Sequence, residues 1–308
     1  MPILTVRHVT TYKYRQPVAF GEHRMTLRPQ GGLDQRLLDF QLKIAPEPAS
    51  LRWYQDVFGN SVAVARFATR SAELRFESIG SIEHTVRSWN DFQPAPYAQT
   101  WPFSYGSEEM PDLVRSVERQ YSDPDQRVDN WARRFLRPEG RTATLDLLSA
   151  MTQAIRREFS YNRRMEKGIQ SPVETLRLEA GTCRDFAVLM MEAVRSLGLA
   201  ARFVSGYIYV PSREGRGHLG GGSTHAWLQV YVPGIGWMDF DPTNAIIGNR
   251  DLIRVAVARD PRQILPLGGS WTGFPGDFLD MDVSVHVSSD EANAGSGPIG
   301  QRIADLRA

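Results

Sequence analysis

The chain has 308 residues, of which 42% are hydrophobic and 23% are charged, and its formal net charge is +1 at pH 7. This length suffices for a full hydrophobic core and for two domains. The balanced charge gives no electrostatic reason to expect a nucleic acid or an anionic membrane as a partner. A single cysteine excludes an intrachain disulfide framework and fits a reducing compartment.

The N-terminal sequence carries no charged segment followed by an apolar one, and nowhere do 18 apolar residues follow one another. We therefore predict a cytoplasmic protein without a membrane segment. The six histidines are scattered, and no His or Cys pair has the spacing of metal ligands. We expect neither a metal nor a cofactor.

Residues 1–88 alternate in hydrophobicity and are rich in β-branched and aromatic side chains, which predicts an all-β, sandwich-like N-terminal domain. We consider this domain a candidate surface for contact with a partner protein or with another copy of the chain. Residues 89–111 combine prolines with aromatic residues, which indicates an extended connector packed on a surface. The expected strands are 3–14, 38–44, 61–67 and 73–86.

Residues 112–290 are predicted to form the second domain. Helical periodicity comes first and strand-like runs follow, so we expect an α+β core in which helices pack on an antiparallel sheet. Residues 291–308 are predicted to be a flexible tail. The expected helices are 113–121, 128–136, 143–159, 173–178 and 183–197, and the expected strands are 201–210, 225–232, 236–241, 252–258 and 281–287.

The only cysteine lies at the predicted start of a helix. Thr182 is a suitable N-cap, Asp185 stands where a capping-box acid belongs, and Gly198 ends the helix. Cys183 would then occupy the first helical position, where free backbone N–H groups and the helix dipole favour a thiolate. The same N–H groups can hold the oxyanion of an acyl-transfer intermediate. Cys183 is therefore a candidate nucleophile.

A predicted hairpin further along the chain supplies an imidazole and a carboxylate. His225 begins the strand 225–232, and Asp241 ends the strand 236–241 after a short Pro-Gly-containing turn. Strand alternation places Ala226 and its alternate neighbours on the core face and His225 on the outward face. A turn that keeps odd positions facing odd puts Asp241 opposite or diagonal to His225, with Asp239 as the alternative orienting acid.

Each of these residues also has an ordinary structural explanation. A lone cysteine is commonly a small buried hydrophobic residue, a histidine at a strand end can simply be hydrogen-bonded, and an aspartate before a proline is a common turn residue. Cys183, His225 and Asp241 together are a more specific pattern. A thiolate, an imidazole that protonates the leaving amine, and an acid that orients the imidazole are the groups that cysteine-dependent acyl transfer needs.

Four motifs in order resemble the transglutaminase-like superfamily: Gly-Thr-Cys-Arg-Asp-Phe-Ala, Ala-Arg-Phe-Val-Ser-Gly-Tyr, Thr-His-Ala-Trp-Leu-Gln-Val-Tyr-Val and Phe-Asp-Pro-Thr-Asn. The resemblance covers about residues 150–260. The segments Val-Arg-His-Val-Thr-Thr-Tyr-Lys-Tyr and His-Arg-Met-Thr-Leu-Arg-Pro resemble the β domain that precedes this core in bacterial transglutaminase-like cysteine proteases. The resemblance implies a papain-like site at Cys183, His225 and Asp241.

Other residues near these motifs are candidates for binding the substrate. Tyr161 is a candidate second oxyanion donor, Arg184 a candidate partner of an acidic substrate group, and Trp227 and Trp237 candidate walls of an acyl-donor groove. Each has a structural alternative, namely packing for the aromatic residues and solvation for Arg184. The loop 211–223 before His225 is either a flap over the site or a solvated hairpin loop.

The sequence thus predicts a cysteine-dependent enzyme acting on amide bonds of a protein or peptide substrate. Hydrolysis of a peptide or isopeptide bond through a thioester is favoured over transamidation, because a water-accessible thioester is hydrolysed unless an amine is bound and positioned. The resemblance covers both proteases and cross-linking enzymes. A non-catalytic, partner-binding scaffold is the alternative from a different class.

Overall fold

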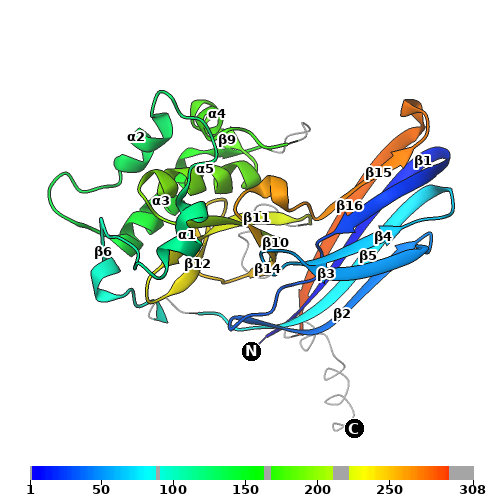
Figure 1. The fold of residues 1–308 in the computed structure, drawn as a ribbon, viewed down its shortest axis with the longest axis horizontal. Helices are drawn as coiled ribbons and strands as arrows, with labels where there is room; N and C mark the ends of the chain where they lie inside the picture. Colours follow the sequence, from blue (N-terminus) through cyan, green and yellow to red (C-terminus); the bar gives the residue numbers. More distant parts are fainter. Residues whose placement is uncertain (1, 88–90, 163–167, 211–221, 291–308) are drawn as a thin grey trace, which may run out of the picture.

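The computed structural model describes residues 2–87, 91–162, 168–210 and 222–290. Figure 1 shows two units side by side, a β domain and a unit in which helices cover a sheet. The predicted α+β class, with a β domain ahead of a helix-plus-sheet core, is confirmed. Of the predicted features, the tail 291–308 and residues 211–221 of the candidate flap lie outside the described residues.

The β domain is organised around one long strand, β1 (Ile3–Met25). Its first half pairs with β5 and its second half with β4, so β1 belongs to both layers of the domain. Apolar side chains of β1 and β5, including Val18 and Met25 of β1 and Phe76 of β5, meet in a buried cluster. The other strands from this part of the chain are β2 (Gln35–Ala45), β3 (Ser50–Gln55), β4 (Ser61–Arg66) and β5 (Ser71–His84).

Two strands from the end of the chain return to this β domain. β15 (Leu267–Thr272) and β16 (Phe278–Ser289) both pair antiparallel with β1. The assignment of all of residues 112–290 to the core is therefore corrected. The sequence of a strand does not by itself show which sheet the strand joins, because pairing depends on the partner strand as well.

The core unit holds a five-stranded antiparallel sheet in the order β13-β12-β11-β10-β14. Helix α5 packs directly on β11 and β10, so its apolar side and the facing side chains of the sheet form one buried cluster. The strands are β10 (Ala201–Ile208), β11 (His225–Val232), β12 (Gly236–Asp241), β13 (Ile246–Ile247) and β14 (Leu252–Ala258); the helices are α1 (Met110–Val117), α2 (Arg127–Arg133), α3 (Thr144–Glu158), α4 (Pro172–Leu178) and α5 (Cys183–Ser196).

The described part of the connector packs against the core. The Trp101 indole donates a hydrogen bond to the Leu197 carbonyl over 2.9 Å, and the Tyr105 hydroxyl donates to the Tyr231 carbonyl over 3.0 Å. This contact agrees with the predicted packing of the aromatic residues. The short elements here and nearby are η2 (Pro96–Ala98), β6 (Thr100–Trp101), β7 (Thr142–Ala143), β8 (Ser160–Tyr161), β9 (Ala180–Gly181), η3 (Pro261–Gln263) and η4 (Pro275–Asp277).

Side-chain amides of the β domain bind the edge of β14 that has no neighbouring strand. Asn60 donates to the Val257 carbonyl and accepts from the Val257 amide, each over 2.8 Å. Gln35 makes the same two-way contact with the backbone of Arg254, at 2.6 and 3.0 Å. Unpaired backbone groups at a buried strand edge are costly, and these amides satisfy them as a neighbouring strand would. The two units are thus joined through specific polar contacts.

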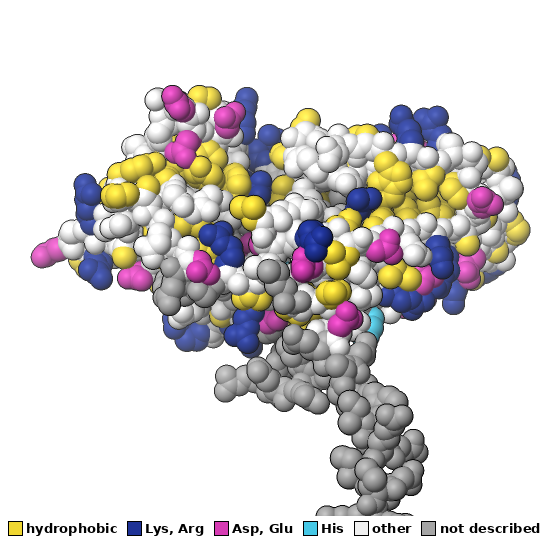
Figure 2. All heavy atoms as spheres, turned by 90° about the horizontal axis from the view of Figure 1, so that it is seen from below, with side chains coloured by type: hydrophobic (Ala, Val, Ile, Leu, Met, Phe, Trp, Pro, Cys, Tyr) yellow, Lys and Arg dark blue, Asp and Glu magenta, His cyan; other side chains and the backbone are white. Residues whose placement is uncertain are grey.

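Among the described residues, no helix is long and apolar enough to span a membrane. Figure 2 shows acidic and basic side chains interspersed over one face of the molecule, with apolar patches between them.

Candidate active site

Cys183 is the first residue of α5, as the capping pattern predicts. The Asp185 carboxylate accepts hydrogen bonds from both the backbone N–H and the hydroxyl of Thr182, each over 2.8 Å. Gly181 is required here, because a Cβ atom at this position would lie 2.9 Å from the Cβ of Asp185. This tight turn fixes the start of α5, and Cys183 is 7% exposed.

The β11–β12 hairpin brings His225 and Asp241 together. Gln229 pairs with Asp239 and Leu228 with Phe240, so Asp241 lies diagonally across from His225. The His225 Nε2 and Asp241 Oδ2 atoms are 2.8 Å apart, and both side chains are buried. Asp241 is therefore the carboxylate that contacts this imidazole, as the predicted hairpin register indicates.

Electrostatics favour the protonated form of His225. Burial alone lowers the pKa of this imidazole, but the Asp241 carboxylate and, to a smaller extent, Cys183 raise it to about 10. The pairing also lowers the pKa of Asp241 against the effect of burial. Within the described residues the Nδ1 atom of His225 has no hydrogen-bond partner. The ring thus presents one nitrogen to Asp241 and keeps the other available near Cys183.

Trp227 supports the imidazole from one side. The two rings are stacked, with centroids 5.9 Å apart and planes inclined by 26°. The Trp227 indole donates to Asp239 Oδ1 over 2.7 Å. Gly206 leaves room for this indole, because a Cβ atom there would lie 2.7 Å from the Trp227 ring. Asp239 therefore anchors Trp227, while Asp241 orients His225.

The prediction that the face of β11 carrying His225 looks outward is wrong about its exposure. His225 is 1% exposed and Trp227 is fully buried. Trp227 packs with Val257 and other apolar side chains of the sheet, and Phe58 from the β domain packs against this cluster. Strand alternation distinguishes the two faces of a sheet, but it cannot show that a second domain covers the polar one.

The other predicted binding residues lie in different surroundings. Tyr161 pairs with Gly181 across β8 and β9, and its ring lies 6.4 Å from that of Phe186 on the helix of Cys183. Arg184 is exposed beside Cys183. Trp237 pairs with Tyr231 at the far end of the hairpin from His225, so the structure does not place it beside His225 and Asp241.

Two contacts of Asp241 had not been predicted from the sequence. Asn244 donates to Asp241 Oδ2 over 2.8 Å, and the Thr243 backbone N–H donates to Oδ1 over 2.9 Å. Both residues belong to the Asp-Pro-Thr-Asn turn, in which an aspartate commonly accepts from the backbone two residues on. The Asp-Pro-Thr-Asn sequence could therefore have predicted the hydrogen bond from the Thr243 backbone to the Asp241 carboxylate. In the described ranges, no group of three or more His, Cys, Asp or Glu side chains could hold a metal ion.

Two family models match consecutive parts of the chain. Residues 4–83 match the bacterial transglutaminase-like N-terminal region, and residues 129–242 match the transglutaminase-like superfamily. The resemblance drawn from the motifs is confirmed. The chain combines a bacterial transglutaminase-like N-terminal region with a transglutaminase-like core.

Three of the proteins that are similar to this chain match it over most of their length. An uncharacterised protein of Mycobacterium tuberculosis is 27% identical over 298 residues, which cover 91% of each chain. An uncharacterised protein of Mycobacterium leprae is also 27% identical, over 92% of this chain and 98% of its own. A crystal structure of a candidate cysteine protease from Cytophaga hutchinsonii covers 94% of this chain and 90% of its own, with a TM-score of 0.69 and 18% identity. This last similarity supports the fold.

The raised pKa of His225 leads to a test in which Asp241→Asn and Asp239→Asn are compared. In the unchanged chain His225 should stay protonated well above pH 6.5, because its pKa is raised to about 10. Loss of the Asp241 charge leaves burial to dominate, so the imidazole of Asp241→Asn should be neutral at pH 7. Nitrogen NMR of labelled histidine measures this directly.

Asp239→Asn is the control, because Asp239 is also buried but donors other than His225 bind its carboxylate. The free energy of unfolding gives a second measurement. The pKa of His225 is raised in the folded state, so the His225–Asp241 pair adds its full share to the free energy of unfolding below pH 6.5. This stabilisation is lost as the pH rises toward 10. A His225 that titrates alike in both variants would contradict the assignment.

Proposed function

We propose that the protein is a cysteine-dependent enzyme that hydrolyses peptide or isopeptide bonds through a Cys183-His225-Asp241 triad. The observation that carries the proposal is the His225 ring. Its Nε2 atom is bound to Asp241 over 2.8 Å, its Nδ1 atom has no partner within the described residues, and Cys183 contributes to its raised pKa. An imidazole held in this way can form an ion pair with a thiolate and later donate a proton.

The proposed reaction begins when the Cys183 thiolate attacks the carbonyl carbon of the scissile amide. A C–S bond forms and the carbonyl oxygen becomes an oxyanion, which the backbone N–H at the start of α5 can stabilise. The C–N bond then breaks as His225 gives its Nδ1 proton to the departing amine. Asp241 keeps the ring oriented throughout and stabilises its protonated form. The product of this half-reaction is a thioester on Cys183.

Water resolves the thioester in the second half-reaction. Neutral His225 takes a proton from water, the resulting hydroxide adds to the thioester carbonyl, and the C–S bond breaks. The carboxylic acid leaves and the thiolate–imidazolium pair is restored, so the protons balance over one cycle. We include Tyr161 as second oxyanion donor and Arg184 as a contact for an acidic substrate group. The single cysteine fits a cytoplasmic site of action.

The first test uses the fact that the chain has one cysteine, so alkylation by iodoacetamide reports on Cys183 alone. A free cysteine is only about 1% thiolate at pH 6.5, whereas a thiol paired with an imidazolium should react at least about tenfold faster. His225→Gln should remove this advantage. His286→Gln is the matched control, because the His286 side chain is exposed on β16.

A second test separates hydrolysis from transamidation. A panel of glutamine-containing peptides is incubated with the enzyme and a labelled primary amine, and both acyl products are followed over time. We expect free acid to accumulate faster than the amine conjugate, because water reaches a thioester unless an amine is bound first. Faster incorporation of the label would instead make the protein a transglutaminase. A Cys183 thiol as slow as free cysteine in the alkylation assay would favour the non-catalytic scaffold.

A further inference from the structure

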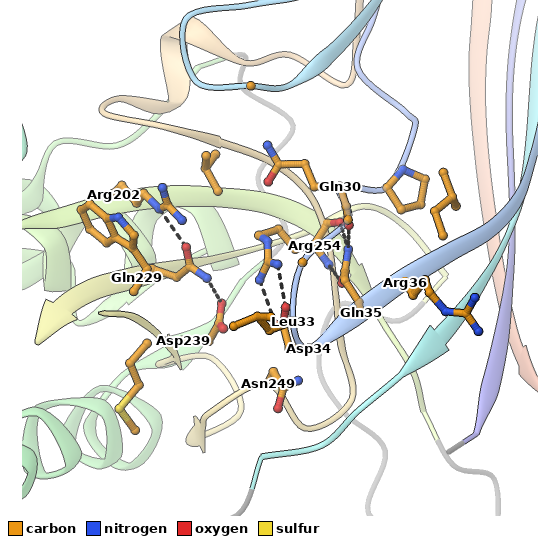
Figure 3. A pocket seen from close by; sticks show the side chains of 18 of the residues that line it. Gln30, Leu33, Asp34, Gln35, Arg36, Arg202, Gln229, Asp239, Asn249 and Arg254 are labelled. Carbon is orange, nitrogen blue, oxygen red and sulfur yellow. Dashed lines mark hydrogen bonds and ion pairs between the residues drawn. The ribbon is translucent and has the colours of Figure 1, made fainter. Parts of the chain in front are cut away.

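We propose that a pocket between the two units binds a small ligand through a carboxylate or phosphate group, with Arg202 as the principal contact. The pocket has a volume of about 720 Å³ and lies between segment 28–37 of the β domain and strands β10, β11 and β12 of the core. Figure 3 shows it from close by. Cys183, His225 and Asp241 are absent from its lining, so it is separate from the triad. Cavities of this size accommodate small organic ligands.

Positive charge dominates the pocket, in contrast to the mixed charges on the outer face in Figure 2. Two of the cations already have partners: Arg254 pairs with Asp34 over 2.9 Å, and Arg36 pairs with Glu83 over 2.8 Å. The remaining charge still favours an anion. The charged residues of the lining are Arg28, Arg36, Arg87, Arg202 and Arg254, with Asp34 and Asp239 as the acids.

Arg202 is one of three cations of the lining, with Arg28 and Arg87, that form no ion pair among the described residues. Its Nε atom donates to Gln229 Oε1 over 2.8 Å, and its guanidinium lies 4.2 Å from the ring centroid of Trp237. Within the described residues it forms no ion pair, and its Nη atoms have no hydrogen-bond partner. Burial and the nearby charge of Arg254 lower the pKa of Arg202 to about 10. A desolvated guanidinium in this state gains most from an incoming anion.

The surrounding side chains hold Arg202 ready for such a ligand. Gln229 Nε2 donates to Asp239 Oδ1 over 2.9 Å, which fixes the amide so that its oxygen faces Arg202. Asp239 forms no ion pair with Arg202 among the described residues, although its charge raises the pKa of Arg202 against the effect of burial. Its Oδ1 atom accepts from Gln229 and Trp227, and burial raises the pKa of this acid. The two Nη atoms of Arg202 therefore remain for the fork-like binding of two oxygens of one anion.

Isothermal titration of the full chain with inorganic phosphate and with citrate tests the proposal. At least one probe should bind, and Arg202→Gln should weaken that binding at least about tenfold. Arg202→Lys keeps the charge but loses the fork, so it should also weaken binding. Arg66→Gln is the control, because Arg66 pairs with Glu22 on the surface and does not line the pocket. Binding of phosphate alone, or of citrate alone, identifies which oxyanion the pocket takes.

Failure of both probes to bind the unchanged chain would overturn the proposal. An equal loss of affinity in Arg66→Gln would also overturn it, because the attraction would then be diffuse. Should Arg202→Gln fail to fold, Arg202→Lys carries the test, and unchanged affinity in that variant would count against Arg202. Cys183→Ala should bind the probes as the unchanged chain does, which keeps this test independent of the proposed catalytic activity.

Discussion

A buried carboxylate and a buried imidazole hold each other across the β11–β12 hairpin, with His225 Nε2 and Asp241 Oδ2 2.8 Å apart. Both groups are buried away from water, so the charge of each is stabilised by the other. Removal of one partner from such a pair typically lowers the stability of the fold by about 3 to 5 kcal/mol. Asn244 and the Thr243 backbone satisfy the other lone pairs of the carboxylate. The pair leaves Nδ1 without a hydrogen-bond partner within the described residues, and this is the ring atom that donates a proton in the reaction we propose.

The second domain is part of what makes this burial possible. Asn60 and Gln35 satisfy the free edge of β14, and Phe58 packs against the cluster around Trp227. The face of the sheet that carries His225 is therefore enclosed between the two units. Away from the triad, the same junction opens into the pocket lined by Arg202. The interface between the two units thus buries the His225 imidazole and also contains a separate, cationic cavity.

The local parts of this structure followed from the sequence, and the parts that depend on distant partners did not. The strands 225–232, 236–241 and 252–258 have the predicted bounds, because alternation and a short turn specify them. The start of α5 followed from its capping pattern. By contrast, the strands β3 and β15 were not predicted, and neither was the pairing of β16 with β1. The sequence also did not indicate that the side-chain amides of Asn60 and Gln35 bind the backbone of β14. The contacts of Asn60 with Val257 and of Gln35 with Arg254 join residues that are 197 and 219 positions apart in the sequence.

Direct detection of the acyl-enzyme would test the central claim best. An activated peptide ester is mixed with the full chain, the reaction is stopped with acid during turnover, and the digested protein is analysed by mass spectrometry. The account predicts an acyl group on the peptide that contains Cys183, which disappears as free acid forms. Steady product formation with no adduct on Cys183, or with an adduct on another residue, would contradict it.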